Sequence, residues 1–73
     1  MLVAGFLKFK GKDNTILYLK KDQVTSIIEH ENGIGVYTVG SKDPYKLTSE
    51  DFPVAQLRQA LGDMGIVSEV LKD

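Results

Sequence analysis

Three adjacent residues, Glu29-His30-Glu31, come closest in this sequence to a metal or acid–base cluster. His30 is the only histidine, and imidazole is both a common metal ligand and a proton carrier near neutral pH. The surrounding residues predict a β-strand, however, and neighbouring side chains of a strand point to opposite faces. Glu29 and Glu31 then share a face that His30 does not. The three groups cannot converge on one ion, and two carboxylates fall short of the roughly six to eight oxygens that calcium prefers.

Other catalytic patterns are equally weak. Gly11-Lys12-Asp13-Asn14 joins two predicted strands, opens no helix and lacks the Gly-Lys-Ser/Thr ending of a phosphate-binding loop. Gly33-Ile34-Gly35 lacks the third glycine and the strand-to-helix setting of a dinucleotide site. With one histidine, no cysteine and no G-x-S-x-G sequence, a nucleophilic triad has little to build on. We therefore expect no enzyme activity, no cofactor and no metal site.

Lysines gather in the N-terminal part of the chain. Residues 1–21 contain five lysines and one aspartate, a balance of +4, whereas the remaining residues have a balance of −5. These lysines are Lys8, Lys10, Lys12, Lys20 and Lys21. Phe6, Phe9 and Tyr18 lie among them, and basic residues interleaved with aromatic ones can bind phosphates while bases stack on the rings.

This N-terminal hairpin is therefore the candidate surface for weak, salt-dependent nucleic-acid binding, which we hold as the alternative function. Two other interpretations remain open. The basic hairpin could meet the acidic half of another subunit through electrostatic complementarity. Its lysines could also simply protect an edge strand from aggregation.

The hydrophobic pattern predicts the elements that position these residues. Strands are expected at residues 2–10, 15–20, 24–31 and 34–39, with a brief fifth strand at 45–47. Val54, Leu57, Leu61 and Met64 recur at spacings of three and four, which predicts an amphipathic helix. The expected fold class is α+β: a small antiparallel β-meander of four to five strands with one C-terminal helix packed on one face. Residues 66–71 are a candidate for a last edge strand.

The pair Asn32-Gly33 predicts a hairpin with a two-residue type I′ turn, because these residues tolerate positive φ best. That turn pairs Glu31 with Ile34 and Ile28 with Tyr37, and it places apolar side chains on both faces of the hairpin. A helix of about 13 residues is ~20 Å long and covers only one face of a small sheet. We expect the stripe of Ile28, Tyr37 and Val39 to face the helix.

The opposite stripe would leave Ile27, Ile34 and Val36 exposed in a monomer, rimmed by Glu29 and Glu31. An apolar cluster with a charged rim is typical of a subunit interface. The sequence therefore predicts a small non-enzymatic interaction or structural module that self-associates through its sheet, as a homo-oligomer or as an accessory subunit of a protein complex.

The composition sets the remaining limits. With 73 residues, of which 42% are apolar and 26% charged, the chain is expected to form a single domain, residues 1–73, with a packed core. The longest apolar run, residues 1–7, is far shorter than the ~20 residues of a membrane helix and lacks the features of a signal peptide. We expect no membrane association and a cytoplasmic location.

Overall fold

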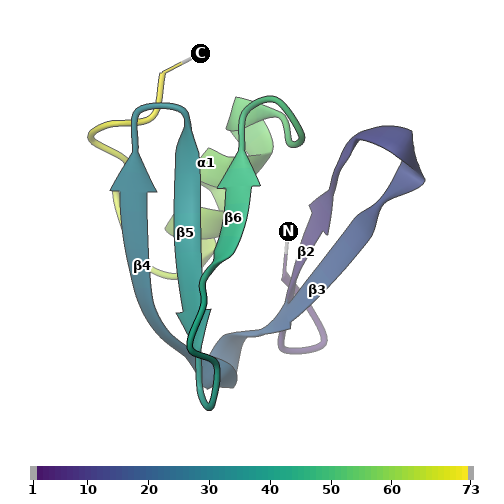
Figure 1. Ribbon diagram of the computed structural model, residues 1–73, viewed down its shortest axis with the longest axis vertical. Coiled ribbons are helices and arrows are strands. Elements are labelled where there is room, and N and C mark those ends of the chain that lie inside the picture. The colour runs from purple at the N-terminus through teal and green to yellow at the C-terminus, as the bar shows by residue number, and fades with distance from the viewer. Residues whose placement is uncertain (1, 73) are drawn as a thin grey trace.

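The computed structural model describes residues 2–72 and confirms the α+β class (Figure 1). Within this range six strands precede one α-helix: β1 (Leu2–Val3), β2 (Phe6–Lys10), β3 (Ile16–Lys20), β4 (Val24–His30), β5 (Gly33–Thr38), β6 (Tyr45–Thr48) and α1 (Val54–Asp63). Each paired strand is antiparallel to its neighbour in the sequence. The antiparallel strands and the C-terminal helix predicted from the sequence are therefore confirmed.

The described strands form two sheets and not one continuous meander. One sheet has the order β1-β2-β3 and the other the order β4-β5-β6. A 3-10 turn at Lys21–Gln23 separates them. The Lys21 amide donates to the Gly5 carbonyl (2.9 Å), and the Gln23 carbonyl accepts from the Val39 amide (2.8 Å). These bonds hold the turn against both sheets, so β4 begins a new sheet instead of pairing with β3.

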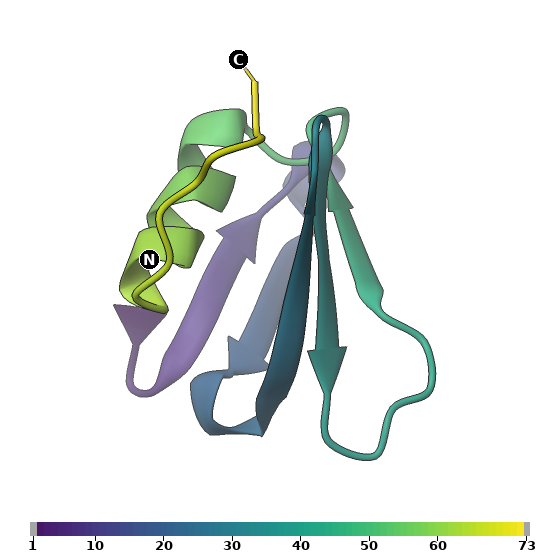
Figure 2. The ribbon, with the colours of Figure 1, turned by 90° about the vertical axis from the view of Figure 1, so that its left-hand side faces the viewer.

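One apolar core lies between the two sheets and α1. Figures 1 and 2 show α1 behind the β4–β5–β6 sheet and beside β2, and the helix contacts β2 of one sheet and β5 of the other. The rings of Phe9 and Phe52 meet edge to face at 6.1 Å, a favoured geometry for buried aromatic pairs. The buried core consists of Leu7, Phe9, Leu19, Ile34, Val36, Leu47, Phe52, Leu57, Ala60, Leu61 and Leu71.

The β4–β5 hairpin differs from the predicted register by two residues. His30 pairs with Gly33, so Glu31 and Asn32 form the turn. Neither Asn32 nor Gly33 has a positive φ, and the prediction of a type I′ turn at this pair is wrong.

Gly33 is required by the packing of β5 against β6 and not by the turn. A Cβ at this position would lie 2.4 Å from the Leu47 carbonyl oxygen, so only glycine lets β5 approach β6 this closely.

The prediction of which hairpin face lies inside is also wrong. A shift of two residues leaves every side chain on its original face. The stripe expected outside is the buried one: Ile34 and Val36 are 3% and 1% exposed, and Ile27 is half-buried against the same core. Ile28, expected inside, is 46% exposed. Ile27, Ile34 and Val36 therefore form no exposed apolar cluster, and the predicted interface loses its surface.

The segment after α1 is not the expected edge strand. The chain reverses at Gly65, which has a φ of 79°, and then runs beside β4 (Figure 1). No strand is assigned to residues 66–71. The Lys72 amide donates to the Glu31 carbonyl at 3.2 Å, and Leu71 is buried in the core. This C-terminal tail (residues 66–72) lies against β4 without forming a ladder.

The burial of Val36 gives a direct test of the two faces. We expect Val36→Lys to lower the free energy of unfolding by about 3 kcal/mol or more, because it places an unpaired charge in the core. Ile28→Lys, on the exposed face of the same hairpin, should change it by only ~0.5 kcal/mol. Urea unfolding followed by circular dichroism measures both variants. A stable Val36→Lys beside an unfolded Ile28→Lys would show that the faces are reversed.

Candidate functional site

The outer face of the β2–β3 hairpin collects three of the five predicted lysines. Strand alternation buries Leu7 and Phe9, so the side chains between them point outward. Phe9 therefore belongs to the core and not to a stacking surface. We call the resulting surface the lysine–aromatic face; its members are Phe6, Lys8, Lys10, Ile16, Tyr18 and Lys20.

The cross-strand register pairs each lysine of this face with an aromatic or aliphatic residue. Phe6 lies opposite Lys20, Lys8 opposite Tyr18, and Lys10 opposite Ile16. Every cross-strand pair thus joins one lysine to one aromatic or aliphatic side chain. Side chains directly opposite one another in an antiparallel pair are about 5 Å apart at Cβ, close enough for one ligand to touch both.

Two exposed aromatic rings lie next to each other on the lysine–aromatic face. Phe6 and Tyr18 are 38% and 51% exposed, and their rings meet edge to face at 6.4 Å with an interplanar angle of 89°. The Lys8 Nζ lies 6.0 Å from the centroid of the Tyr18 ring, at the outer limit of a cation–π contact. A positive charge and an accessible ring face are therefore presented side by side.

The charge of this face is uncompensated by its own strands, since neither β2 nor β3 contains a carboxylate. The two other predicted lysines lie outside it. Lys12 pairs with Asp51 at 3.1 Å, and Lys21 begins the 3-10 turn before β4. The structure thus brings Lys8, Lys10 and Lys20 together but not Lys12 and Lys21.

Helix α1 flanks the lysine–aromatic face along the edge of β2. The Gln56 side chain bonds the main chain of Lys10: its Nε2 donates to the carbonyl (2.9 Å), and its Oε1 accepts from the amide. Beside this anchor lies a shallow hollow of about 250 Å³ lined by Lys8, Lys10, Gln56 and Gln59. Amide side chains are hydrogen-bonding groups, so Gln59 extends the polar rim of the face.

Glu29 and Glu31, predicted to rim an interface, are engaged by the protein's own C-terminal tail. The Glu29 carboxylate accepts hydrogen bonds from the Ser68 hydroxyl (2.5 Å) and from the amides of Glu69 and Leu71 (both 3.2 Å). The Ser68 hydroxyl and these amides together lower the pKa of Glu29. Glu31 forms an exposed ion pair with Lys72 at 3.3 Å. Glu29 therefore fastens the tail to β4, and the exposed pair of Glu31 with Lys72 is a weak contact at the β4–β5 turn.

His30 stands apart from these carboxylates, as strand alternation predicts. It is exposed on the outer face opposite Gly33, whereas Glu29 points to the tail. Among residues 2–72, no group of three or more His, Cys, Asp or Glu side chains is placed to hold a metal ion.

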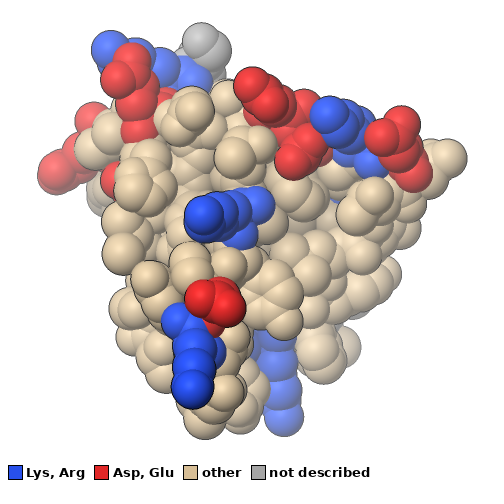
Figure 3. Space-filling model, viewed as in Figure 1, with Lys and Arg blue, Asp and Glu red and all other residues tan. Residues whose placement is uncertain are grey.

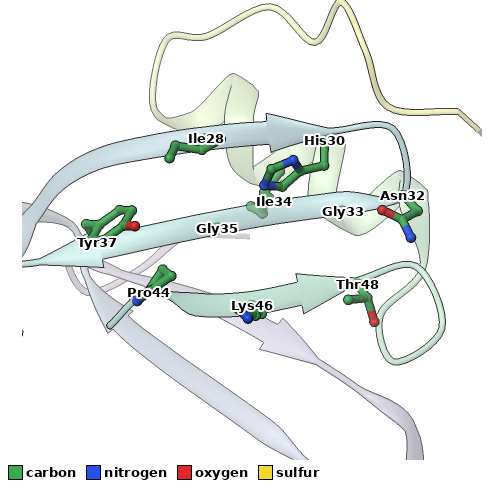
Figure 4. Close-up of a pocket in the computed structure, with 10 residues that line it drawn as sticks. All are labelled: Ile28, His30, Asn32, Gly33, Ile34, Gly35, Tyr37, Pro44, Lys46 and Thr48. Atoms are coloured by element: carbon green, nitrogen blue, oxygen red, sulfur yellow. The ribbon is translucent and has the colours of Figure 1, made fainter. Parts of the chain in front are cut away.

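The outer face of the β4–β5–β6 sheet carries a second candidate site that sequence reasoning missed. Figure 3 shows one basic group near the centre of this face, an acidic group a short way below it with another basic group beside it, and further charged groups toward the margin. A hollow of about 460 Å³ opens here (Figure 4), and we call it the glycine trough; its lining includes Ile28, His30, Gly35, Tyr37, Pro44 and Lys46. The recurrence of glycine at positions 33 and 35, on one face of a strand, is the sequence signal that could have located it.

Comparison with known proteins returns no relative. No protein-family model, no curated protein and no solved structure matches the chain. Within residues 2–72, no helix combines the length and apolar character needed to cross a bilayer.

The contacts of Glu29 predict a pH-dependent attachment of the tail. Because these bonds lower the pKa of Glu29 in the folded protein, its stabilising contribution is complete above the ordinary glutamate range and is lost as the pH falls through the lowered pKa. We expect the hydrogen-exchange protection of the Glu69 and Leu71 amides to fall on acidification. In Glu29→Gln it should be low at every pH.

The matched control for this experiment is Glu31→Gln, which removes only an exposed ion pair. It should retain the protection and its pH dependence. Equal protection factors in Glu29→Gln and the wild type, measured by NMR, would show that the carboxylate does not hold the tail.

Proposed function

We propose that this protein is a small non-enzymatic binding module that holds single-stranded nucleic acid on its lysine–aromatic face. One observation carries the proposal: the β2–β3 register sets each of three lysines beside an exposed aromatic or aliphatic side chain, on strands without a carboxylate. A positively charged surface with aromatic stacking platforms is the common chemistry of proteins that bind single strands without strong sequence preference.

Each part of the face has a separate role in this proposal. Lys8, Lys10 and Lys20 neutralise phosphates, while unpaired bases stack on Tyr18 and Phe6. Lys8 and Lys10 are two residues apart along β2 and thus about 6.6 Å apart along the strand, so they contact the backbone at successive points. Stacking needs only the flat face of a base, so we expect little dependence on nucleotide sequence.

The exposed rings favour a single strand over a duplex. The bases of a duplex are already stacked on one another, so Phe6 and Tyr18 gain little from them. The three lysines attract both forms, and the denser charge of a duplex favours the duplex in this electrostatic contribution. A higher affinity for the single strand is therefore the sign that bases stack on the aromatic rings.

The overall charge of −1 limits how tight this binding is. Three phosphate contacts give a slope of about −2 for log K against log salt on a single strand, so raising the salt fourfold weakens binding roughly 20-fold. Each stacked base adds about 1–3 kcal/mol to the binding free energy.

We propose a cytoplasmic location for this activity, as the composition predicts. Self-association stays a prediction without an assigned surface.

The proposal predicts the behaviour of charge-reversal variants. Lys8→Glu and Lys20→Glu should each weaken the binding of a labelled single-stranded oligonucleotide at low salt, and each should make the salt slope shallower by about 0.7. Tyr18→Ala should weaken single-strand binding by about 1–3 kcal/mol while changing duplex binding little. Fluorescence anisotropy measures all three.

Lys42→Glu is the matched control, since it makes the same charge change in the loop between β5 and β6, away from the lysine–aromatic face. It should leave the salt slope unchanged. Absence of binding to any oligonucleotide at tens of micromolar protein and low salt would overturn the proposal. Equal losses of affinity in Lys42→Glu and Lys8→Glu would also overturn it, because the effect would then come from the net charge of the protein and not from this face.

A further inference from the structure

The glycine trough is a consequence of which residues the centre strand β5 places on the outer face. Across the three strands, Gly33 lies between His30 and Thr48, and Gly35 lies between Ile28 and Lys46. Tyr37 follows as the next outward residue of β5. The centre of the sheet thus has no side chain over two successive positions and a large ring at the third.

We infer that the glycine trough binds a small molecule that combines a flat apolar ring with a single anionic group. The ring lies over Gly35 between Ile28 and Tyr37, and the anion meets the Lys46 ammonium. Nothing in this inference depends on nucleic-acid binding, since the trough and the lysine–aromatic face are on different sheets.

The width of the trough suits an aromatic ring. Adjacent strands are ~4.8 Å apart, so β4 and β6 stand about 9.6 Å apart across Gly35, whereas at Gly33 the main chain of β6 lies closer to β5. In an ordinary sheet the side chains of the centre strand fill this gap. The volume of about 460 Å³ falls within the size range of small-molecule sites.

The charges around the trough select an anion. Lys46 and His30 line it, and among the described residues of the lining none is acidic. Of the three carboxylates that neighbour lining residues in the sequence, Glu29 holds the tail and Glu31 pairs with Lys72, while Asp43 adjoins Pro44 at the far end of the trough without being part of the lining. An anion therefore meets no negative group of the lining, whereas a cation would face Lys46.

The shape of the site favours a small molecule over an extended peptide. A peptide that adds to a sheet uses free main-chain groups at an edge, but β5 is paired on both sides, with β4 and β6. Tyr37 and Pro44 stand at the end of the trough opposite the β4–β5 turn, as Figure 4 shows. The site is thus an open hollow bounded at one end by Tyr37 and Pro44.

The test titrates the isotope-labelled protein with naphthalene-2-carboxylate and follows amide chemical shifts by NMR. The expected dissociation constant is on the order of 1 mM, as for other ligands of this size, with the largest shifts at Ile28, Gly35, Tyr37 and Lys46. The uncharged analogue 2-naphthylmethanol should bind at least about fivefold more weakly, because it gains nothing from Lys46.

Two variants separate this site from non-specific adsorption. Gly35→Val fills the trough at a position where a Cβ meets only ordinary contacts, the nearest being the Pro44 Cβ at 3.7 Å, and it should reduce affinity at least about tenfold. Lys46→Ala should abolish the preference for the carboxylate over the alcohol. Lys42→Ala, outside the lining, should preserve it.

Shifts scattered over the whole surface would overturn the inference, as would equal affinity of the wild type, Gly35→Val and Lys46→Ala. If Gly35→Val fails to fold, as its own spectrum would show, Lys46→Ala alone decides. Unchanged selectivity for the carboxylate in that variant would remove the basis of the proposed site.

Discussion

The burial of one face of each small sheet against a shared core is the constraint on which the rest of this structure depends. A chain of 73 residues supplies one short helix within the described range, and α1 packs against β2 and β5 at once. Leu7, Phe9 and Leu57, each at most 1% exposed, bring the first sheet and the helix into that core. Since strand side chains alternate, the residues between the buried ones must face outward.

Two outer faces of different chemistry follow from this constraint. The outer face of the first sheet exposes lysines beside aromatic rings. This pattern suits a partner that carries negative charges and flat rings. The outer face of the second sheet has two glycines in its centre strand, and Ile28 and Lys46 flank the second of them. The missing side chains leave a hollow for a small ligand. The C-terminal tail is fixed to β4 through Glu29 and adds to neither face. The two candidate sites are therefore independent consequences of one packing arrangement.

The sequence predicted the local elements well and their arrangement less well. The spacing of Val54, Leu57 and Leu61 was sufficient for the helix, whereas Phe9, grouped in the sequence analysis with the stacking aromatics, is buried in the core. The inner face of β4–β5 could not be read from hydrophobicity, because both stripes carry large apolar residues. Two further features have no signal in that pattern: β5 approaches β6 closely at Gly33, and an irregularity between Val24 and Ser26 turns Val24 to the core side. The Glu29–Ser68 contact, 39 residues apart in the chain, leaves no local signal.

The central claim is that the outer face of β2 and β3 is the binding surface of this protein. The most direct test is a chemical-shift map of the isotope-labelled protein titrated with a short oligothymidylate at low salt. The account predicts that the largest shifts fall on Phe6, Lys8, Tyr18 and Lys20, and that they reverse when salt is added. Largest shifts on the outer face of β4, β5 and β6, with β2 and β3 unaffected, would contradict it.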